Sequence, residues 1–138
     1  MLKVDTKTSV ISYDLKEGFL RVVVKANVDM EVNDARLDME ESSKLVNGKK
    51  RPVLVDGRKM TYHSKEVREY YASKEVAESI SAMAIMIDSI PTRIFGNFFI
   101  KISKPHFPTR LFDDQNLAEQ WLKEIVNQKY IDKFAFRK

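Results

Sequence analysis

The sequence predicts an α/β domain in which helices cover a largely parallel sheet. Two short apolar runs, Val53-Leu54-Val55-Asp56 and Met83–Asp88, each end in aspartate, and each is followed by a polar turn and an amphipathic segment. Such runs are typical of strands buried on both faces. Strands that alternate with helices require crossover connections, and hence a parallel sheet. We expect the order ββαβαβαβα, with the initial hairpin at one side.

The composition is that of an ordinary folded domain with a mild positive charge. The 138 residues are 43% hydrophobic and carry a formal net charge of +4. This length fits one domain over residues 1–138. No apolar run approaches the ~20 residues that span a bilayer, and the N-terminal segment lacks the apolar core of a signal peptide. The absence of cysteine excludes disulfides and fits a reducing compartment, so we expect a cytoplasmic protein.

The charge pattern argues against a nucleic-acid partner. Basic residues form local clusters such as Lys49-Lys50-Arg51, but acidic residues break up much of the surface. Nucleic-acid binders usually concentrate basic charge on one face and add aromatic stacking residues.

The first half of the chain predicts a hairpin, a helix and a buried strand. Residues Thr8–Tyr13 and Phe19–Lys25 are rich in β-branched and aromatic residues, and a loop containing glycine joins them. Apolar residues spaced three or four apart predict a helix from Val32 to Val46, which Asn47-Gly48 ends. The strand Val53–Asp56 follows.

A small repeat comes next, in which Ser64 and Ser73 each precede Lys-Glu-Val. Each serine can cap a helix, and each leaves an acid in the first turn, where the helix dipole favours it. We expect two short helices, or one helix kinked at Ser73.

The second half predicts two strands, each followed by a helix. The strand Ser81–Ile87 leads to a helix that opens at Ser89-Ile90-Pro91, with proline near its first position. The strand Thr109–Phe112 leads to a last helix, which Asp113-Asp114 cap. Residues 129–138 are basic and aromatic, and we interpret them as a C-terminal tail that docks, contacts a partner or frays.

The helix after Pro91 carries many large apolar residues. One arc of it consists of Ile94, Phe95, Phe98, Phe99 and Ile102. Ile100 falls outside this arc, and Gly96 lies beside it, where a missing side chain permits close approach of another backbone. Burial against the sheet is one interpretation. The other is an apolar pocket or a dimer contact, with Phe95, Phe98, Phe99 and Ile100 as candidates.

Several segments, together with this order of elements, resemble the STAS/SpoIIAA-like superfamily. They are the runs Asn47–Asp56, Gly96–Lys101 and Pro108–Asp114, with Ala118 and Trp121-Leu122 after them. The resemblance covers about residues 11–125 and is strongest to the small stand-alone bacterial branch grouped with STAS and SEC14 (CRAL-TRIO) domains. It implies a SpoIIAA-like mixed sheet with helices packed on it. These motifs are structural, so they support fold rather than activity.

Anti-sigma-factor antagonists in this superfamily are switched by phosphorylation of a serine at a helix start, in an Asp-Ser-Ser-Gly-like motif. The layout of Val53–Val67 is similar. The alignment places Lys65 and Glu66 where the two serines would be. The resemblance therefore leaves Ser64 as the phosphosite candidate and Thr61 as a weaker one.

No catalytic set can be assembled from the sequence. The two histidines, His63 and His106, are far apart and have no carboxylate at metal-ligand spacing. A triad also needs a nucleophile and an oxyanion site, and there is no glycine-rich phosphate loop. We interpret His63 as a polar loop or helix-entry residue. The sequence predicts no enzyme, no metal site and no cofactor.

One constellation remains at the edge of the predicted sheet. If the strands are parallel, the loops after Asp56 and Ile87 lie on the same edge, near two helix starts, which attract anions. The anion-binding candidates there are Arg58, Thr61, Thr92 and Arg93. An apolar tail of the ligand would contact Phe95, Phe98 and Phe99.

The sequence therefore favours a non-catalytic regulatory or protein-interaction module, whose partner is another protein or a second copy of the chain. The alternative, which the resemblance to SEC14 domains implies, is a carrier or sensor of a small amphipathic, lipid-like anionic ligand. An unrecognised enzyme comes third.

Overall fold

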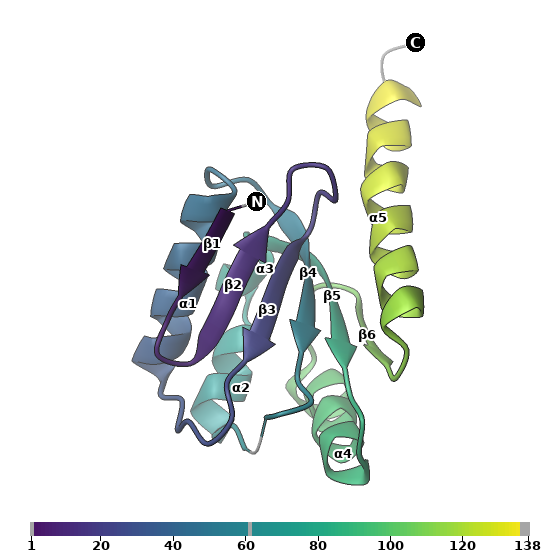
Figure 1. Cartoon of the computed structure of the whole chain (residues 1–138). Coiled ribbons are helices and arrows are strands. Elements are labelled where there is room, and N and C mark those ends of the chain that lie inside the picture. Colours follow the sequence, from purple (N-terminus) through teal and green to yellow (C-terminus); the bar gives the residue numbers. More distant parts are fainter. Residues whose placement is uncertain (1, 61, 136–138) are drawn as a thin grey trace.

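A six-stranded mixed sheet forms the middle layer of the protein (Figure 1). The computed structural model describes residues 2–60 and 62–135, with side chains up to residue 128. The strands are β1 (Leu2–Asp5), β2 (Ser9–Tyr13), β3 (Leu20–Val24), β4 (Arg51–Asp56), β5 (Ile80–Met86) and β6 (Thr109–Phe112). They lie side by side in chain order. β1, β2 and β3 pair antiparallel, and β3 to β6 pair parallel.

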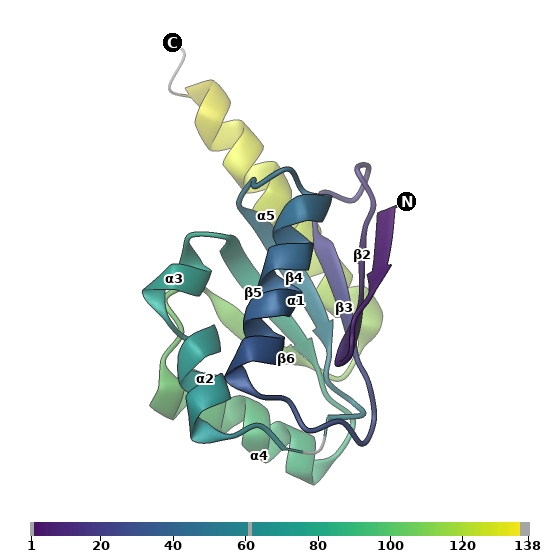
Figure 2. The same cartoon turned by 90° about the vertical axis from the view of Figure 1, so that its left-hand side faces the viewer.

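Helices cover both faces of this sheet. They are α1 (Val32–Leu45), α2 (Lys65–Tyr71), α3 (Lys74–Ala77), α4 (Ile90–Phe98), the π-helical segment η1 (Phe99–Ser103) and α5 (Gln115–Ala135). Figure 2 shows α1 to α4 on one side of the sheet and the first turns of α5 on the other. Right-handed crossovers between successive neighbouring strands place their helices on one face, so α5 is left to cover the opposite face.

The sheet divides the hydrophobic core into two layers, one on each of its faces. On the α5 side, Leu54, Ala84 and Met86 pack with Leu122. On the other side, alternate residues of the same strands pack beneath α1 to α4. Every residue from 82 to 87 is buried, because β5 is covered on both faces. The sequence prediction of an α/β domain with a largely parallel sheet and an initial hairpin at one side is confirmed.

The two serine caps are also confirmed. Ser64 Oγ accepts a hydrogen bond from the Val67 backbone N–H at 3.2 Å, and Ser73 Oγ accepts one from Val76 at 3.3 Å. Two short helices therefore form, which was one of the two expected alternatives. The strand β1 was not predicted, and its alternating apolar and charged residues lie at the sheet edge, where all but the half-buried Val4 are exposed.

The C-terminal tail expected from residue 129 takes the form of a helix as far as Ala135. The helix α5 continues through these residues and projects beyond the sheet (Figure 1). No glycine or proline occurs after Pro108, so the sequence has no signal that would end the helix earlier. Residues 136–138 lie outside the described residues.

The apolar arc predicted on α4 is divided between solvent and interior. Phe99 is buried and Phe95 half-buried, whereas four residues form an exposed row. The exposed row consists of Ile90, Ile94, Phe98 and Ile102, with exposed fractions of 76%, 63%, 41% and 64%. Ile100 was expected outside the buried arc, but it is half-buried. The helix widens into η1 at Phe99, and a π-helical turn changes the angle at which later residues face the sheet.

Gly96 permits a close approach by a side chain, not by another backbone as the sequence suggested. A Cβ at this position would lie 2.5 Å from Cδ2 and 2.9 Å from Cδ1 of Leu111 on β6. Both short contacts are with terminal methyl groups, so the Leu111 side chain must shift before a Cβ can be accommodated. The missing Cβ therefore sets how closely α4 packs on the sheet.

We predict that Gly96→Ala lowers the free energy of unfolding by about 1–2 kcal/mol, because overpacking outweighs the gain in helix propensity. Urea denaturation measures this change. In a Leu111→Ala background the same substitution should be neutral or stabilising. An equal loss in both backgrounds would contradict this account.

Candidate functional site

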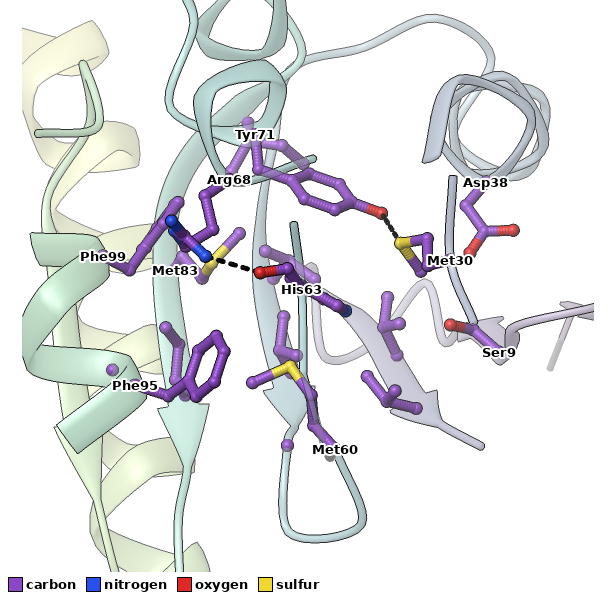
Figure 3. Close-up of a pocket in the computed structure, with 18 of the residues that line it drawn as sticks. Ser9, Met30, Asp38, Met60, His63, Arg68, Tyr71, Met83, Phe95 and Phe99 are labelled. Carbon is purple, nitrogen blue, oxygen red and sulfur yellow. Dashed lines mark hydrogen bonds between the residues drawn. The ribbon is translucent and has the colours of Figure 1, made fainter. Parts of the chain in front are cut away.

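A cavity of about 110 Å³ lies between the sheet and the helices α1, α2 and α4 (Figure 3). Its floor is apolar and comes from alternate residues of four strands. These residues are Ile11, Leu20, Val22, Val24, Val53, Val55, Met83 and Ile85. Phe95 and Phe99 form the wall nearest β5, and Met60 lies on the loop that follows β4. The position of this cavity follows from the fold, because three helices meet above one face of the sheet.

Four methionines line the cavity. They are Met30, Met39, Met60 and Met83, contributed by two loops, a helix and a strand. Methionine side chains are unbranched and change rotamer readily, so they adapt to irregular occupants. These side chains are therefore suited to accommodate occupants of different shape.

Arg68 brings a cation to the wall of this apolar space. Its Nη1 donates a hydrogen bond to the His63 carbonyl oxygen at 2.5 Å, and its guanidinium carbon lies 4.8 Å from the centroid of the Phe98 ring. The Nε–H is buried and has no hydrogen-bond partner among the described residues. A buried donor without an acceptor is destabilising by about 1–3 kcal/mol, so this atom is suited to an acceptor on a ligand.

His63 contributes a neutral ring to the same cavity. Burial and the neighbouring charge of Arg68 lower the pKa of His63 to about 4. The imidazole stacks on Tyr71, with ring centroids 6.2 Å apart. In the described part of the chain its ring has no hydrogen bond to a carboxylate, and Asp56 binds Arg58 instead. The interpretation of His63 as a loop residue holds, but its side chain also lines the cavity.

The two arginines among the predicted anion-binding residues already face carboxylates of the protein, so neither is available as an unpaired cation. Arg58 Nε and Nη2 bind the two carboxylate oxygens of Asp56 at 2.9 and 2.7 Å, and this pairing lowers the pKa of Asp56. Arg93 lies 3.7 Å from Asp113. Thr61 lies outside the described residues.

Two further candidates are used as helix caps. The Thr92 hydroxyl accepts from the Ser89 backbone N–H at 3.1 Å and donates to the Ser89 carbonyl at 3.0 Å, although the residue also touches the cavity. Ser64 is half-buried with its oxygen accepting from Val67. Phosphorylation of Ser64 stays a prediction.

The apolar candidates divide in a way that the sequence did not show. Phe95 and Phe99 line the cavity, Phe98 lies beside Arg68, and Ile100 is half-buried outside the cavity lining. Sequence reasoning missed Arg68. One signal was present, since Arg68 and Tyr71 are three residues apart and therefore share a helix face.

A family model described as a domain of unknown function (DUF7793) matches residues 13–126. The chain belongs to the DUF7793 family. The matched segment runs from the end of β2 into α5 and includes Arg68, His63 and most of the cavity lining. No curated protein and no solved structure matched the chain.

Two kinds of feature are absent from the described part of this DUF7793 domain. No group of three or more His, Asp or Glu residues is placed to hold a metal ion within residues 2–60 and 62–135. Over the same residues, no helix combines the length and hydropathy needed to cross a membrane.

We predict that the low pKa of His63 makes stability fall with acidification. The unfolded state takes up a proton below the ordinary histidine pKa of about 6.5, whereas the native state resists it until about pH 4. The contribution of His63 is therefore present above pH 6.5 and is lost between pH 6.5 and 4. Between pH 7 and 4.5 the loss should be about 2–3 kcal/mol.

Chemical denaturation at both pH values measures this loss, and His63→Gln should reduce it. The matched control is His106→Gln, which changes the other, exposed histidine. If the pH dependence survives in His63→Gln and disappears in His106→Gln, His106 causes it and the prediction is wrong.

Proposed function

We propose that this DUF7793 domain is a cytoplasmic, non-catalytic module that binds a small ligand with an apolar body and an anionic head group, as a sensor or carrier. The observation that carries this proposal is the unpartnered Nε–H of Arg68 at the wall of a largely apolar cavity. The resemblance to STAS and SEC14 domains supports it, since that resemblance implies a regulatory module or a ligand carrier.

The chemistry of Arg68 favours a carboxylate or phosphate as the head group. An oxyanion accepting from Nε–H would satisfy a buried donor of Arg68 that has no partner among the described residues. Charge-assisted hydrogen bonds of this kind are roughly twice as strong as neutral ones, and they gain further in a low-dielectric interior. A neutral carbonyl would satisfy the same donor with less energy.

The cavity volume limits the apolar body to a short one. An apolar cavity of about 150 Å³ holds one benzene molecule, and this cavity is about 110 Å³. A chain of four to eight carbons is therefore a suitable probe, because the methionines can give way to the longer members. Each buried CH₂ group contributes about 0.8 kcal/mol before the costs of association.

We predict that hexanoate binds saturably to the purified protein, and that Arg68→Met weakens this binding at least about tenfold. Isothermal titration calorimetry measures the affinity. Hexanol lacks the anion, so the same variant should change its binding little. The matched control is Arg93→Met, which removes an exposed arginine that faces Asp113 instead of the cavity.

Absence of saturable binding for every anionic probe with an apolar chain of four to eight carbons would overturn the proposed function. Binding that Arg68→Met leaves unchanged would show that the head group lies elsewhere.

The exposed row on α4 and η1 favours a second role, in protein contact. Each large apolar side chain moved from water into an interface contributes roughly 1.5–3 kcal/mol before association costs. Ile90, Ile94 and Ile102 are more than half exposed, and Phe98 lies in the same row. We propose that a second copy of the chain covers this row, since two-fold pairing is the commonest assembly.

We predict that the wild-type protein forms a weak dimer at tens to hundreds of micromolar and that Ile94→Asp abolishes it, because the aspartate would be buried without a partner. Sedimentation equilibrium measures the association. The matched control is Leu37→Asp, which places the same charge on α1, where Leu37 is 55% exposed. A wild-type monomer throughout this range would contradict the dimer.

A further inference from the structure

A second polar group lies at the side of the cavity opposite Arg68. Asp38 extends from α1 and is 5% exposed. It contributes to the cavity lining, and Figure 3 shows Asp38 and Arg68 on opposite sides of the space between them. The floor between these two charged residues is apolar.

The Asp38 carboxyl has few partners within the protein. The Thr8 hydroxyl donates to its Oδ2 at 2.5 Å. Oδ1 receives no hydrogen bond from the described residues, and no described cation lies within ion-pair distance of the carboxyl. The nearby Lys7 binds Asp34 on the same helix instead. A buried carboxyl with a free oxygen is suited to a hydrogen-bond donor on a ligand.

Tyr71 adds a hydroxyl group to the same end. Among the described residues its phenol donates only to the sulfur of Met30, at 3.6 Å, and thioether sulfur is a weak acceptor. Burial, reinforced by the charge of Asp38, raises the pKa of Tyr71, so the hydroxyl stays protonated. The oxygen of this hydroxyl remains able to accept a hydrogen bond from a ligand.

We infer that the ligand carries a protonated amine at the end opposite its anionic head. The anion binds Arg68, the apolar body lies over the sheet, and the ammonium group donates to Asp38 and Tyr71. The ligand class is thus an amphoteric molecule of the ω-amino acid type. This inference rests on the proposed function and specifies the ligand of the same cavity.

The test compares two matched series of probes on the wild-type protein, n-alkanoates and ω-aminoalkanoates of four to eight carbons. An ammonium group in an apolar cavity without a partner would weaken binding many-fold. An ammonium paired with Asp38 should instead strengthen binding about tenfold or more at the chain length that spans the two groups. An unpaired ammonium and an ammonium paired with Asp38 therefore predict opposite changes in affinity when the ω-amino group is added. Calorimetry at pH 7 measures this change.

Substitutions then test which residues cause the preference for ω-aminoalkanoates over alkanoates. Asp38→Asn should remove the advantage of the ω-amino series while hexanoate still binds, and Tyr71→Phe should reduce it. Asp34→Asn is the matched control, one turn earlier on α1 and paired with Lys7, and it should leave the advantage intact. If Asp38→Asn fails to fold, the wild-type comparison and Tyr71→Phe still decide.

Each outcome has a separate meaning. If alkanoates bind and every ω-amino acid binds more weakly, the inference is overturned and the proposed function stands. If neither series binds, both fail. If the ω-amino advantage survives in Asp38→Asn, the amine binds elsewhere and the inference is also overturned.

Discussion

The handedness of the crossovers is the constraint on which the remaining structure depends. The strands β3 to β6 are parallel and adjacent in chain order, and right-handed connections then place α1, α2, α3 and α4 on a single face. The cavity lies where α1, α2 and α4 meet above β3, β4 and β5. The opposite face, covered by α5 alone, forms a separate core layer.

Local patterns predicted the elements well, because their causes are local. The apolar run of β5 indicated burial on both faces, and Ser64 and Ser73 marked two helix starts by their own hydrogen bonds. Features with only a weak local signal in the sequence were not predicted. The four residues of β1 are too few and too polar to stand out, and the π-helical turn at Phe99 is not encoded by any apolar spacing. The rotation of Ile100 inward therefore could not be predicted.

The candidate site was less predictable, since a cavity is the space that packing leaves and no residue pattern encodes it. Sequence reasoning chose arginines near helix starts, but Asp56 neutralises Arg58 two residues away, and Arg93 has Asp113 beside it across the fold. The first pairing could have been inferred from proximity in sequence. The cation of the proposed site, Arg68, is distinguished by a buried Nε–H without a partner, which becomes visible only in the tertiary structure.

Arg68 also connects the cavity to the surface of the protein. Its guanidinium group holds the His63 carbonyl on the loop before α2 and lies against Phe98, a member of the exposed row on α4. An anion that draws Nε toward the cavity must change the balance of these two contacts, because one rigid planar group makes all three interactions. Under the proposed function, a shift of the Arg68 guanidinium would reach the Phe98 ring, which belongs to the row proposed as the dimer contact. A ligand site and a contact surface that share one side chain would give the proposed sensor a direct physical route from binding to output.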